Sequence, residues 1–107
     1  MPPAPAFCPT CGETLVERDI EGRRRRFCPA CDRPVYRNPI PAAGVLVVRE
    51  DPRGLLLIRR GHPPATGQWS LPAGFLEWDE HPKTGAIREL REETGVAVGI
   101  ESLTLFD

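Results

Sequence analysis

The sequence has no long apolar run: nothing in its 107 residues approaches the roughly 18 consecutive apolar residues of a membrane span. Its first residues, MPPAPAFCPT, contain neither the basic start nor the apolar stretch of a secretory signal peptide. We therefore expect a cytoplasmic protein that works without a membrane.

The sequence also lacks a large net charge, and it has no cysteine in its C-terminal two thirds. The formal net charge is -1, so the charge of the whole chain gives no reason to expect a nucleic acid or an anionic membrane as partner. All 4 cysteines lie before residue 32, and in a reducing compartment cysteines of this kind are metal ligands more often than disulfides. Proline, by contrast, is abundant: 13 residues, about 12% against an average near 5%, are spread through the turns.

The chain divides by composition into a cysteine module, residues 1–38, and a second domain, residues 39–107. The connector Val35–Pro41 carries two prolines and should be extended, because proline fixes φ and pushes the preceding residue out of the helical region. A chain this short buries only about 60–65% of its unfolded surface, so a bound metal would help to stabilise it.

Apolar and turn residues predict the elements of the second domain. The run Ala42–Val48 is apolar and β-branched, and predicts a buried strand that forms a hairpin with a second strand, Leu55–Ile58, across turn residues 50–54. Residues 61–68 should be loop. The remaining predictions are a short strand at 69–71, a helix over 82–94 between Pro82 and Gly95, and a final strand at 100–106.

The four cysteines form two Cys-x-x-Cys pairs, separated by a spacing typical of zinc sites. Each pair supplies two thiolates from one tight turn, and zinc prefers four such ligands in a tetrahedron. Gly12 and Asp32 follow the pairs and tolerate the left-handed backbone that such turns often need. The segment between the pairs predicts two short strands, so the module resembles a zinc ribbon with structural Zn²⁺; disulfides or free thiols are the alternative. The expected zinc ligands are Cys8, Cys11, Cys28 and Cys31.

Four consecutive arginines, Arg23–Arg26, allow two interpretations. Guanidinium groups can contact RNA or a substrate phosphate. Alternatively, the run is a solvated strand whose side chains alternate between faces, with Glu17, Asp19 and Glu21 offsetting the charge. We favour the solvated strand, and therefore expect no nucleic acid as partner.

The predicted helix carries three glutamates on one side. At about 100° per residue, Glu89, Glu92 and Glu93 share an arc of about 100°, while Ile87 and Leu90 lie on a separate, mostly apolar stripe. Carboxylates placed so close repel one another unless cations neutralise them. Hard oxygen ligands suit Mg²⁺ or Mn²⁺, which can polarise a phosphoryl group and activate a water.

The residues that flank this helix distinguish it from an ordinary glutamate-rich helix. The segment Gly74–Val96 reads GFLEWDEHPKTGAIRELREETGV, with Gly74, Glu80 and the run Arg88–Val96 at the spacing of the Nudix box. At every defined position it resembles that box, and the upstream residues 67–75, GQWSLPAGF, also resemble the Nudix hydrolase family. With its four cysteines ahead of the box, the chain is similar to NADH pyrophosphatases and to ADP-ribose pyrophosphatase-like members.

The resemblance implies an α+β fold: a Nudix-type α/β/α sandwich with a mixed sheet, preceded by the ribbon. It implies that Glu89, Glu92 and Glu93 bind the catalytic metal, and that Glu80 pairs with Arg88 to orient the helix. Gly74 would allow close approach of the backbone at the site. A complete sandwich needs further strands and a second helix, so we expect the chain to be C-terminally incomplete, or to close its core as a homodimer.

Other residues allow a functional and a structural interpretation. His62 and His81 are expected at the surface, with His81 or Asp79 capping the helix. Trp69 is expected in the core, whereas Trp78 is a candidate for stacking on a substrate base. Arg59 and Arg60 follow a predicted strand, and we select Arg59 as the candidate substrate contact.

The predicted activity is metal-dependent hydrolysis of a small-molecule nucleotide: the pyrophosphate of a nucleoside diphosphate linked to another group, as in NADH or ADP-ribose. Two alternatives stay open. One is a zinc-ribbon protein whose Nudix domain senses a nucleotide without turnover, and the other is RNA binding and decapping by the same chemistry. The intact carboxylate set favours the enzyme, because a pure sensor does not need every carboxylate.

Overall fold

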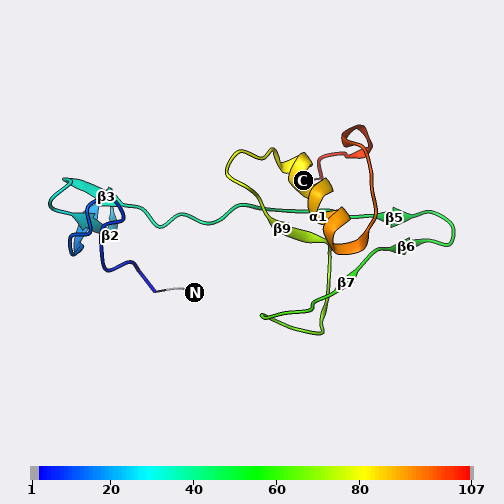
Figure 1. Cartoon of the computed structure of the whole chain (residues 1–107), viewed down its shortest axis with the longest axis horizontal. Helices are drawn as coiled ribbons and strands as arrows, with labels where there is room; N and C mark the ends of the chain where they lie inside the picture. Colours follow the sequence, from blue (N-terminus) through cyan, green and yellow to red (C-terminus); the bar gives the residue numbers. More distant parts are fainter. Residues whose placement is uncertain (1–2, 107) are drawn as a thin grey trace. The chain divides into compact units, whose positions relative to one another are not determined.

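The computed structural model describes residues 3–106 and divides into two compact units, Met1–Pro39 and Ile40–Asp107 (Figure 1). Each unit is described by itself. No helix in residues 3–106 is both long and apolar enough to cross a membrane.

The first unit is a three-stranded antiparallel sheet in the order β1-β2-β3, formed by β1 (Val16–Ile20), β2 (Arg23–Cys28) and β3 (Arg33–Val35). The two strands predicted between the cysteine pairs are confirmed. The third strand was not predicted, because it contains Pro34, which cannot donate a hydrogen bond. Proline is accommodated there because β3 is an edge strand.

The core of this unit is small and built around the cysteines. Cys8, Leu15 and Cys28 are buried, and Cys31 and Val35 pack against them. With so little apolar area, a core of this size gives a domain little stability by itself, so a metal crosslink is the expected supplement.

Six short strands make up the sheet elements of the second unit: β4 (Ala42–Gly44), β5 (Val48–Arg49), β6 (Gly54–Leu55), β7 (Ile58–Arg59), β8 (Trp69–Ser70) and β9 (Ala73–Phe75). They pair as β4–β9, β5–β6 and β7–β8, and within residues 3–106 every pairing of strands is antiparallel. The predicted hairpin across residues 50–54 and the short strand at 69 are confirmed.

The two long strands predicted at 42–48 and 55–58 are each split in two. After β4, the Val45 N–H donates to Pro72 O at 3.0 Å, whereas Val47 O accepts from the Leu56 N–H at 2.9 Å. The chain therefore changes hydrogen-bonding partners within three residues, from the segment next to β9 to the segment after β6. This change interrupts the regular ladder.

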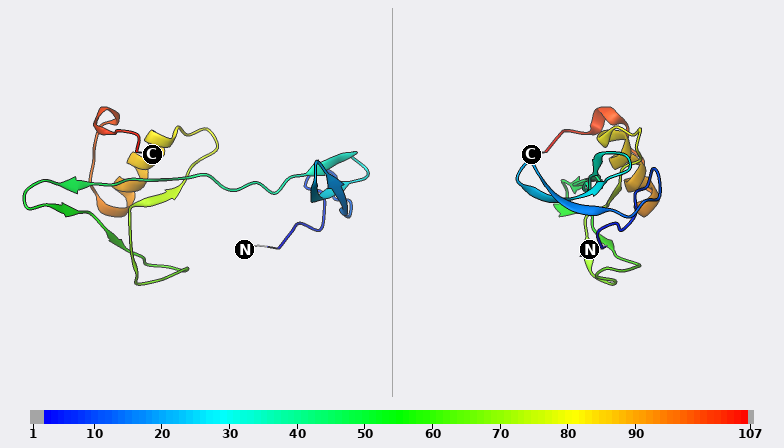
Figure 2. Two further views of the ribbon diagram at one scale, coloured as in Figure 1. Left: turned by 180° about the vertical axis from the view of Figure 1, so that it is seen from behind. Right: turned by 90° about the vertical axis from the view of Figure 1, so that its left-hand side faces the viewer.

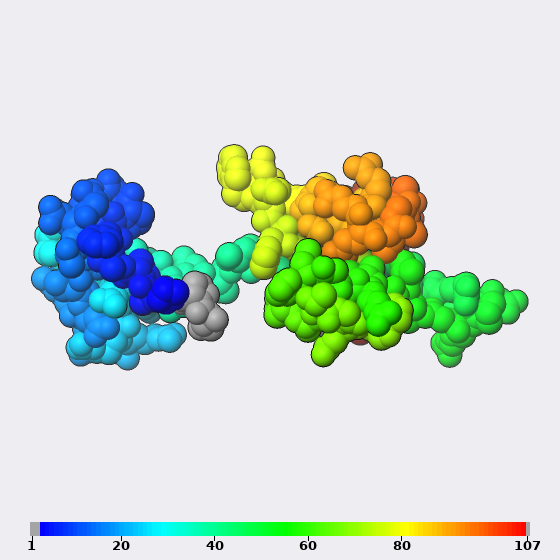
Figure 3. Space-filling view, turned by 60° about the horizontal axis from the view of Figure 1, so that its bottom comes forward, coloured from blue at the N-terminus to red at the C-terminus, as the bar shows by residue number. Residues whose placement is uncertain are grey.

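The prediction that these strands are buried is wrong. Side chains alternate along them: Leu46, Val48, Leu55 and Leu57 are exposed, whereas Val45, Val47, Leu56 and Ile58 are half-buried. One side of the β5–β6 hairpin is thus apolar and open to solvent. Its turn projects from the rest of the unit (Figure 3).

Helix α1 (Pro82–Thr94) begins and ends where the sequence predicts. His81 Nδ1 accepts a hydrogen bond from the Lys83 N–H at 3.2 Å, which caps the first turn. Gly95 ends the helix in the left-handed region with φ 78°. The helix packs against β4 and β9 (Figures 1 and 2), and its buried residues are Gly85, Ala86 and Leu90.

The predicted final strand at 100–106 is wrong. The chain forms a 3-10 turn, η1 (Ile100–Ser102), and residues 103–106 have no regular structure, with Leu105 and Phe106 exposed. Alternating apolar residues form a strand only beside a partner that satisfies their backbone groups, and no strand of residues 3–106 pairs with this segment. The α+β class is confirmed, with α1 as the one α-helix among these residues.

Candidate functional site

Arg88 of α1 lies at the centre of a network of carboxylates. Its Nε and Nη2 donate to the two oxygens of Glu80 at 2.7 and 2.9 Å. Its Nη1 donates to Glu89 at 2.9 Å and to Glu92 at 3.2 Å, and Nη2 also donates to Phe75 O at 3.1 Å. A single guanidinium therefore connects the loop before the helix, the helix itself and strand β9.

Glu80 is the most constrained carboxylate of this network. Its side chain is only 8% exposed, and Oε2 also accepts from the Glu77 N–H at 3.0 Å. The Arg88 guanidinium, and after it the Glu77 N–H, lowers the pKa of Glu80 to about 2. The pairing that the resemblance implied for Glu80 and Arg88 is present in the structure, in a two-point geometry that fixes orientation as well as charge.

Two glycines allow helix α1 to approach its neighbours. A Cβ on Gly74 of β9 would overlap the carboxyl group of Glu89. A Cβ on Gly85 would overlap Leu76 and come within 3.0 Å of Glu80 Oε2. The absence of side chains at these positions leaves room for the carboxylates, which the sequence analysis expected for Gly74 alone.

Glu93 is held by a different group. Its Oε2 accepts a hydrogen bond from the Ala73 N–H at 3.0 Å, at the start of β9. Partial burial raises the pKa of Glu93, and the charges of Glu89 and Glu92 act in the same direction. Arg60 opposes this effect electrostatically. The three helix carboxylates thus lie on one side of α1, with Glu89 and Glu92 sharing Arg88 Nη1 as donor and Glu93 accepting from the Ala73 N–H.

The carboxylates of α1 are clustered less tightly than the cysteines are. Among residues 3–106, the cysteines form the one group of three or more metal-binding side chains whose ligand atoms all lie within 4.8 Å of one another. Glu89 and Glu92 contact Arg88 Nη1, and Glu93 contacts the Ala73 N–H instead. The carboxylates are close enough to influence one another's charge, and are not gathered into a closed cage.

The remaining candidate residues lie apart from this network. The Arg59 Nε donates to Gly67 O at 3.0 Å, and its guanidinium lies 5.7 Å from the ring centre of Trp69. Trp69 is 66% exposed, so its prediction as a core residue is wrong: β7 and β8 form a two-stranded pair that leaves its ring uncovered. Trp78 is 94% exposed. The cation that acts on Glu93 is Arg60, which the sequence analysis ranked behind Arg59.

In the first unit, the sulfur atoms of Cys8, Cys11, Cys28 and Cys31 lie within 4.8 Å of one another. The sulfur atoms of Cys11 and Cys28 lie 3.4 Å apart. A tetrahedron with Zn–S bonds of about 2.3 Å has edges of about 3.8 Å, so the cluster has the dimensions of a four-thiolate zinc site. Gly12 and Asp32 adopt φ of 80° and 53°, as predicted for the two turns.

The thiols of this cluster differ in acidity. Backbone N–H groups of Cys11 and Thr10 lower the pKa of Cys8 to about 6. Hydrogen bonding with the Cys11 and Cys28 sulfurs raises the pKa of Cys31 to about 12. Four sulfurs this close cannot all be thiolates without a cation between them, and a divalent metal supplies the charge that would release the remaining protons.

The NUDIX domain model matches residues 38–107, which include the carboxylate network on α1. The chain belongs to the NUDIX family. Among curated relatives, it is 54% identical over 67 residues to a "MutT-like protein" of Streptomyces ambofaciens, covering 63% of this chain and 40% of that protein. It is also 38% identical over 92 residues to "NAD-capped RNA hydrolase NudC" of Stutzerimonas stutzeri, covering 86% of this chain and 32% of that protein.

Solved structures agree with the family assignment. A NUDIX hydrolase from Nitrosomonas europaea is 39% identical with a TM-score of 0.70, over 80% of this chain and 49% of that one. A MutT/nudix family protein from Enterococcus faecalis is 32% identical with a TM-score of 0.57, over 64% of this chain and 28% of that one. The chain thus spans less than half the length of these relatives.

The Glu80–Arg88 pair predicts how stability changes with pH. Because the pKa of Glu80 in the folded protein is about 2, below the ordinary 4.5, its ionised form contributes stability above pH 4.5 and loses it as the pH falls toward 2. We expect Glu80→Gln to be less stable than the wild type at neutral pH, with the difference shrinking as the pH falls through this window. Urea unfolding followed by circular dichroism measures this.

The matched control is Glu50→Gln, an exposed glutamate in the turn between β5 and β6. Its stability should follow the wild type at every pH. A Glu80→Gln protein that parallels the wild type over the same range would show that the pair does not stabilise the fold.

Proposed function

We propose that this chain forms part of a metal-dependent hydrolase that cleaves the pyrophosphate of a nucleoside diphosphate linked to another group. The observation that carries the proposal is the Arg88 network, which holds Glu80, Glu89 and Glu92 on the side of α1 where Glu93 meets the start of β9. Family membership supports the reaction class.

The donor set suits Mg²⁺ or Mn²⁺, which prefer carboxylate oxygens. Glu89, Glu92 and Glu93 would hold the ion, and the raised pKa of Glu93, caused by burial and by the neighbouring carboxylates, is the direction expected where a cation is needed for charge balance. When bound, the metal would polarise the phosphoryl group and activate a water.

The chain's own residues prepare this site. Arg88 fixes the side chains of Glu89 and Glu92 while Glu80 fixes Arg88, so the carboxylates need little reorganisation when a substrate arrives. The Ala73 N–H orients Glu93, and the bare Gly74 backbone leaves space beside Glu89. Arg60, whose charge acts on Glu93, is our candidate for contact with a substrate phosphate.

For the substrate, NADH or ADP-ribose remains our first proposal. An NAD group at the end of an RNA is the second candidate, because several relatives are named NAD-capped RNA hydrolases. All three contain a pyrophosphate that joins adenosine to a second ribose, so the same carboxylates would serve each of them. A measurement of turnover distinguishes both proposals from a nucleotide sensor, because a sensor would bind the nucleotide without releasing product.

The carboxylates should dominate activity in any form of the protein that turns over. Glu92→Gln and Glu93→Gln keep shape but remove charge from the metal site, and we expect each to lower kcat about 10²–10³-fold at saturating Mg²⁺. Glu80→Gln acts through Arg88 and should cost less, about 10–100-fold. Nucleotide release from NADH, ADP-ribose and NAD-capped RNA is the measurement.

Glu50→Gln serves as the control with the same charge change far from the network. Near wild-type turnover by both Glu92→Gln and Glu93→Gln would refute the assignment. A larger loss in Glu80→Gln than in Glu93→Gln would show that their roles are reversed.

Gly74→Ala tests the close approach of β9 to α1. The methyl group would displace the flexible end of Glu89 rather than backbone, so we expect a small change in the free energy of unfolding, below about 1 kcal/mol, with a much larger loss of kcat. Gly61→Ala is the control, since a Cβ there meets nothing within 4 Å. Full activity in Gly74→Ala would show that Glu89 does not belong to the catalytic site.

We also propose that the cysteine cluster holds one structural Zn²⁺. Elemental analysis of metal-replete protein should give one zinc per chain, and Cys28→Ser, which removes the most buried sulfur, should lose the metal and unfold the first unit. Zinc near zero together with two intact disulfides would overturn the proposal.

A further inference from the structure

The first unit has a sheet whose two faces carry different charges. In an antiparallel pair, directly opposed residues lie on the same face, and the register pairs Arg18 with Arg25 and Ile20 with Arg23. The same alternation adds Phe27, opposite Val16, and Pro34. We name this side the arginine face, formed by Val16, Arg18, Ile20, Arg23, Arg25, Phe27 and Pro34.

The acidic residues of the strands lie on the other face. There, Arg24 forms ion pairs with Glu17 at 2.9 Å and with Asp19 at 3.7 Å. Within β1, β2 and β3, whose residues are all described, the arginine face carries three guanidinium groups and no carboxylate. The nearly neutral composition of the chain conceals this separation, because Glu17 and Asp19 alternate with Arg18 along β1.

Of the four arginines Arg23–Arg26, only those on the face opposite the arginine face fit the expectation of a solvated strand offset by acidic residues. Arg24 is offset by acidic neighbours as predicted. Arg25, in contrast, has no carboxylate on its face and its Nε is buried without a hydrogen-bond partner.

Aromatic rings accompany these arginines. The Arg18 guanidinium lies 3.9 Å from the ring centre of Phe27, and that of Arg25 lies 5.1 Å from the ring centre of Tyr36. Stacking on a ring holds a guanidinium in place while leaving N–H groups at its edge for acceptors. Tyr36 directly follows β3 and is 54% exposed, so part of its ring is open to a ligand.

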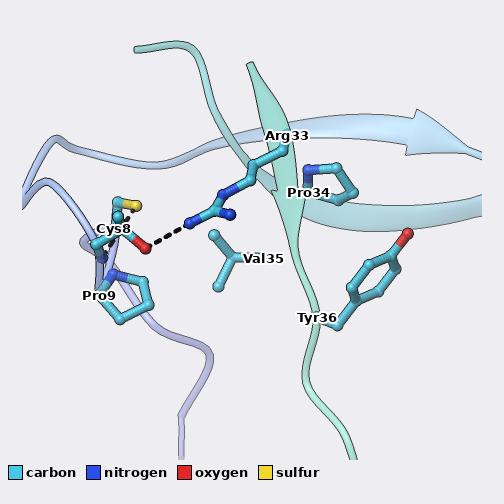
Figure 4. Close-up of a pocket in the computed structure, with 7 residues that line it drawn as sticks. Cys8, Pro9, Arg33, Pro34, Val35 and Tyr36 are labelled. Carbon is cyan, nitrogen blue, oxygen red and sulfur yellow. Dashed lines mark hydrogen bonds between the residues drawn. The ribbon is translucent and has the colours of Figure 1, made fainter. Parts of the chain in front are cut away.

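A groove of about 420 Å³ runs along the edge strand β3 and includes Tyr36 in its lining. Figure 4 shows Pro34 and Tyr36 on one side of this strand, with Arg33 and Val35 on the side of Cys8. The groove is largely apolar, with Pro9, Pro34 and Val35 among its lining residues. It offers a flat base a place beside the Tyr36 ring.

We propose that the arginine face and Tyr36 bind a single strand of nucleic acid. Arg18, Arg23 and Arg25 would neutralise successive backbone phosphates, and Tyr36 would stack on an unpaired base. A duplex offers phosphates but keeps its bases paired and stacked, so it would bind more weakly. The inference concerns the ribbon unit and does not depend on the proposed hydrolysis.

Fluorescence anisotropy of the whole chain with labelled oligonucleotides of about 12 nucleotides tests the proposal. RNA and DNA single strands should both bind, and the matching duplexes should bind more weakly. Arg18→Gln combined with Arg25→Gln should lower affinity at least tenfold and reduce the salt slope by about 1.4, since each phosphate contact on a single strand contributes about 0.7.

The matched control is Arg24→Gln combined with Arg26→Gln, which removes the same charge from the opposite face and should bind nearly as well as the wild type. Tyr36→Leu should lose about tenfold or more in affinity while Tyr36→Phe retains it, and this pair keeps the test valid if the double arginine variant does not fold. Equal losses in both double variants, tighter binding of duplexes, full competition by polyglutamate, or no binding by the wild type would overturn the proposal.

Discussion

The second unit depends on one constraint: the Arg88 guanidinium must bind carboxylates from two segments and a backbone carbonyl from a third at the same time. Five donors in a rigid plane make this possible, and no lysine could reproduce it. Through Glu80, Arg88 orders the loop that precedes α1, and through Phe75 O it fixes the helix to β9. The positions of Glu89 and Glu92 follow from that arrangement.

This network also explains why glycine is required nearby. A helix held so close to β9 leaves no room for a side chain at Gly74, where Glu89 lies, nor at Gly85, where Leu76 and Glu80 lie. Packing and electrostatics therefore act together: the strong Arg88–Glu80 pair draws the elements together, and the glycines make the short distance sterically possible.

The first unit is stabilised in a different way. Its buried residues are Cys8, Cys28, Leu15 and Phe27, so the proposed zinc would supply cohesion that larger domains obtain from apolar area. Because the cysteine turns lie at one end of the sheet, the rest of the strand surface is free to carry function. Its arginines, aromatic rings and segregated charges occupy this surface.

The sequence by itself determined the features that depend on near neighbours. Pro82 and Gly95 delimit α1, the two Cys-x-x-Cys pairs bring four thiols together, and the spacing of Glu80 and Arg88 identifies a pair that the structure contains. Each of these depends on residues a few positions apart or on a motif with strict spacing, so local geometry is enough to predict it.

Only the tertiary structure decided which groups from distant segments meet. The Ala73 N–H that holds Glu93, the effect of Arg60 on the same carboxyl and the exposure of Trp69 could not be predicted, because nothing in the residues adjacent to them specifies the partner. The same holds for Arg25 and Tyr36, which the register of β1, β2 and β3 places on one face. Hydrogen bonds, burial and charge separation are properties of pairs of segments, and the pairing of segments is decided when the chain folds.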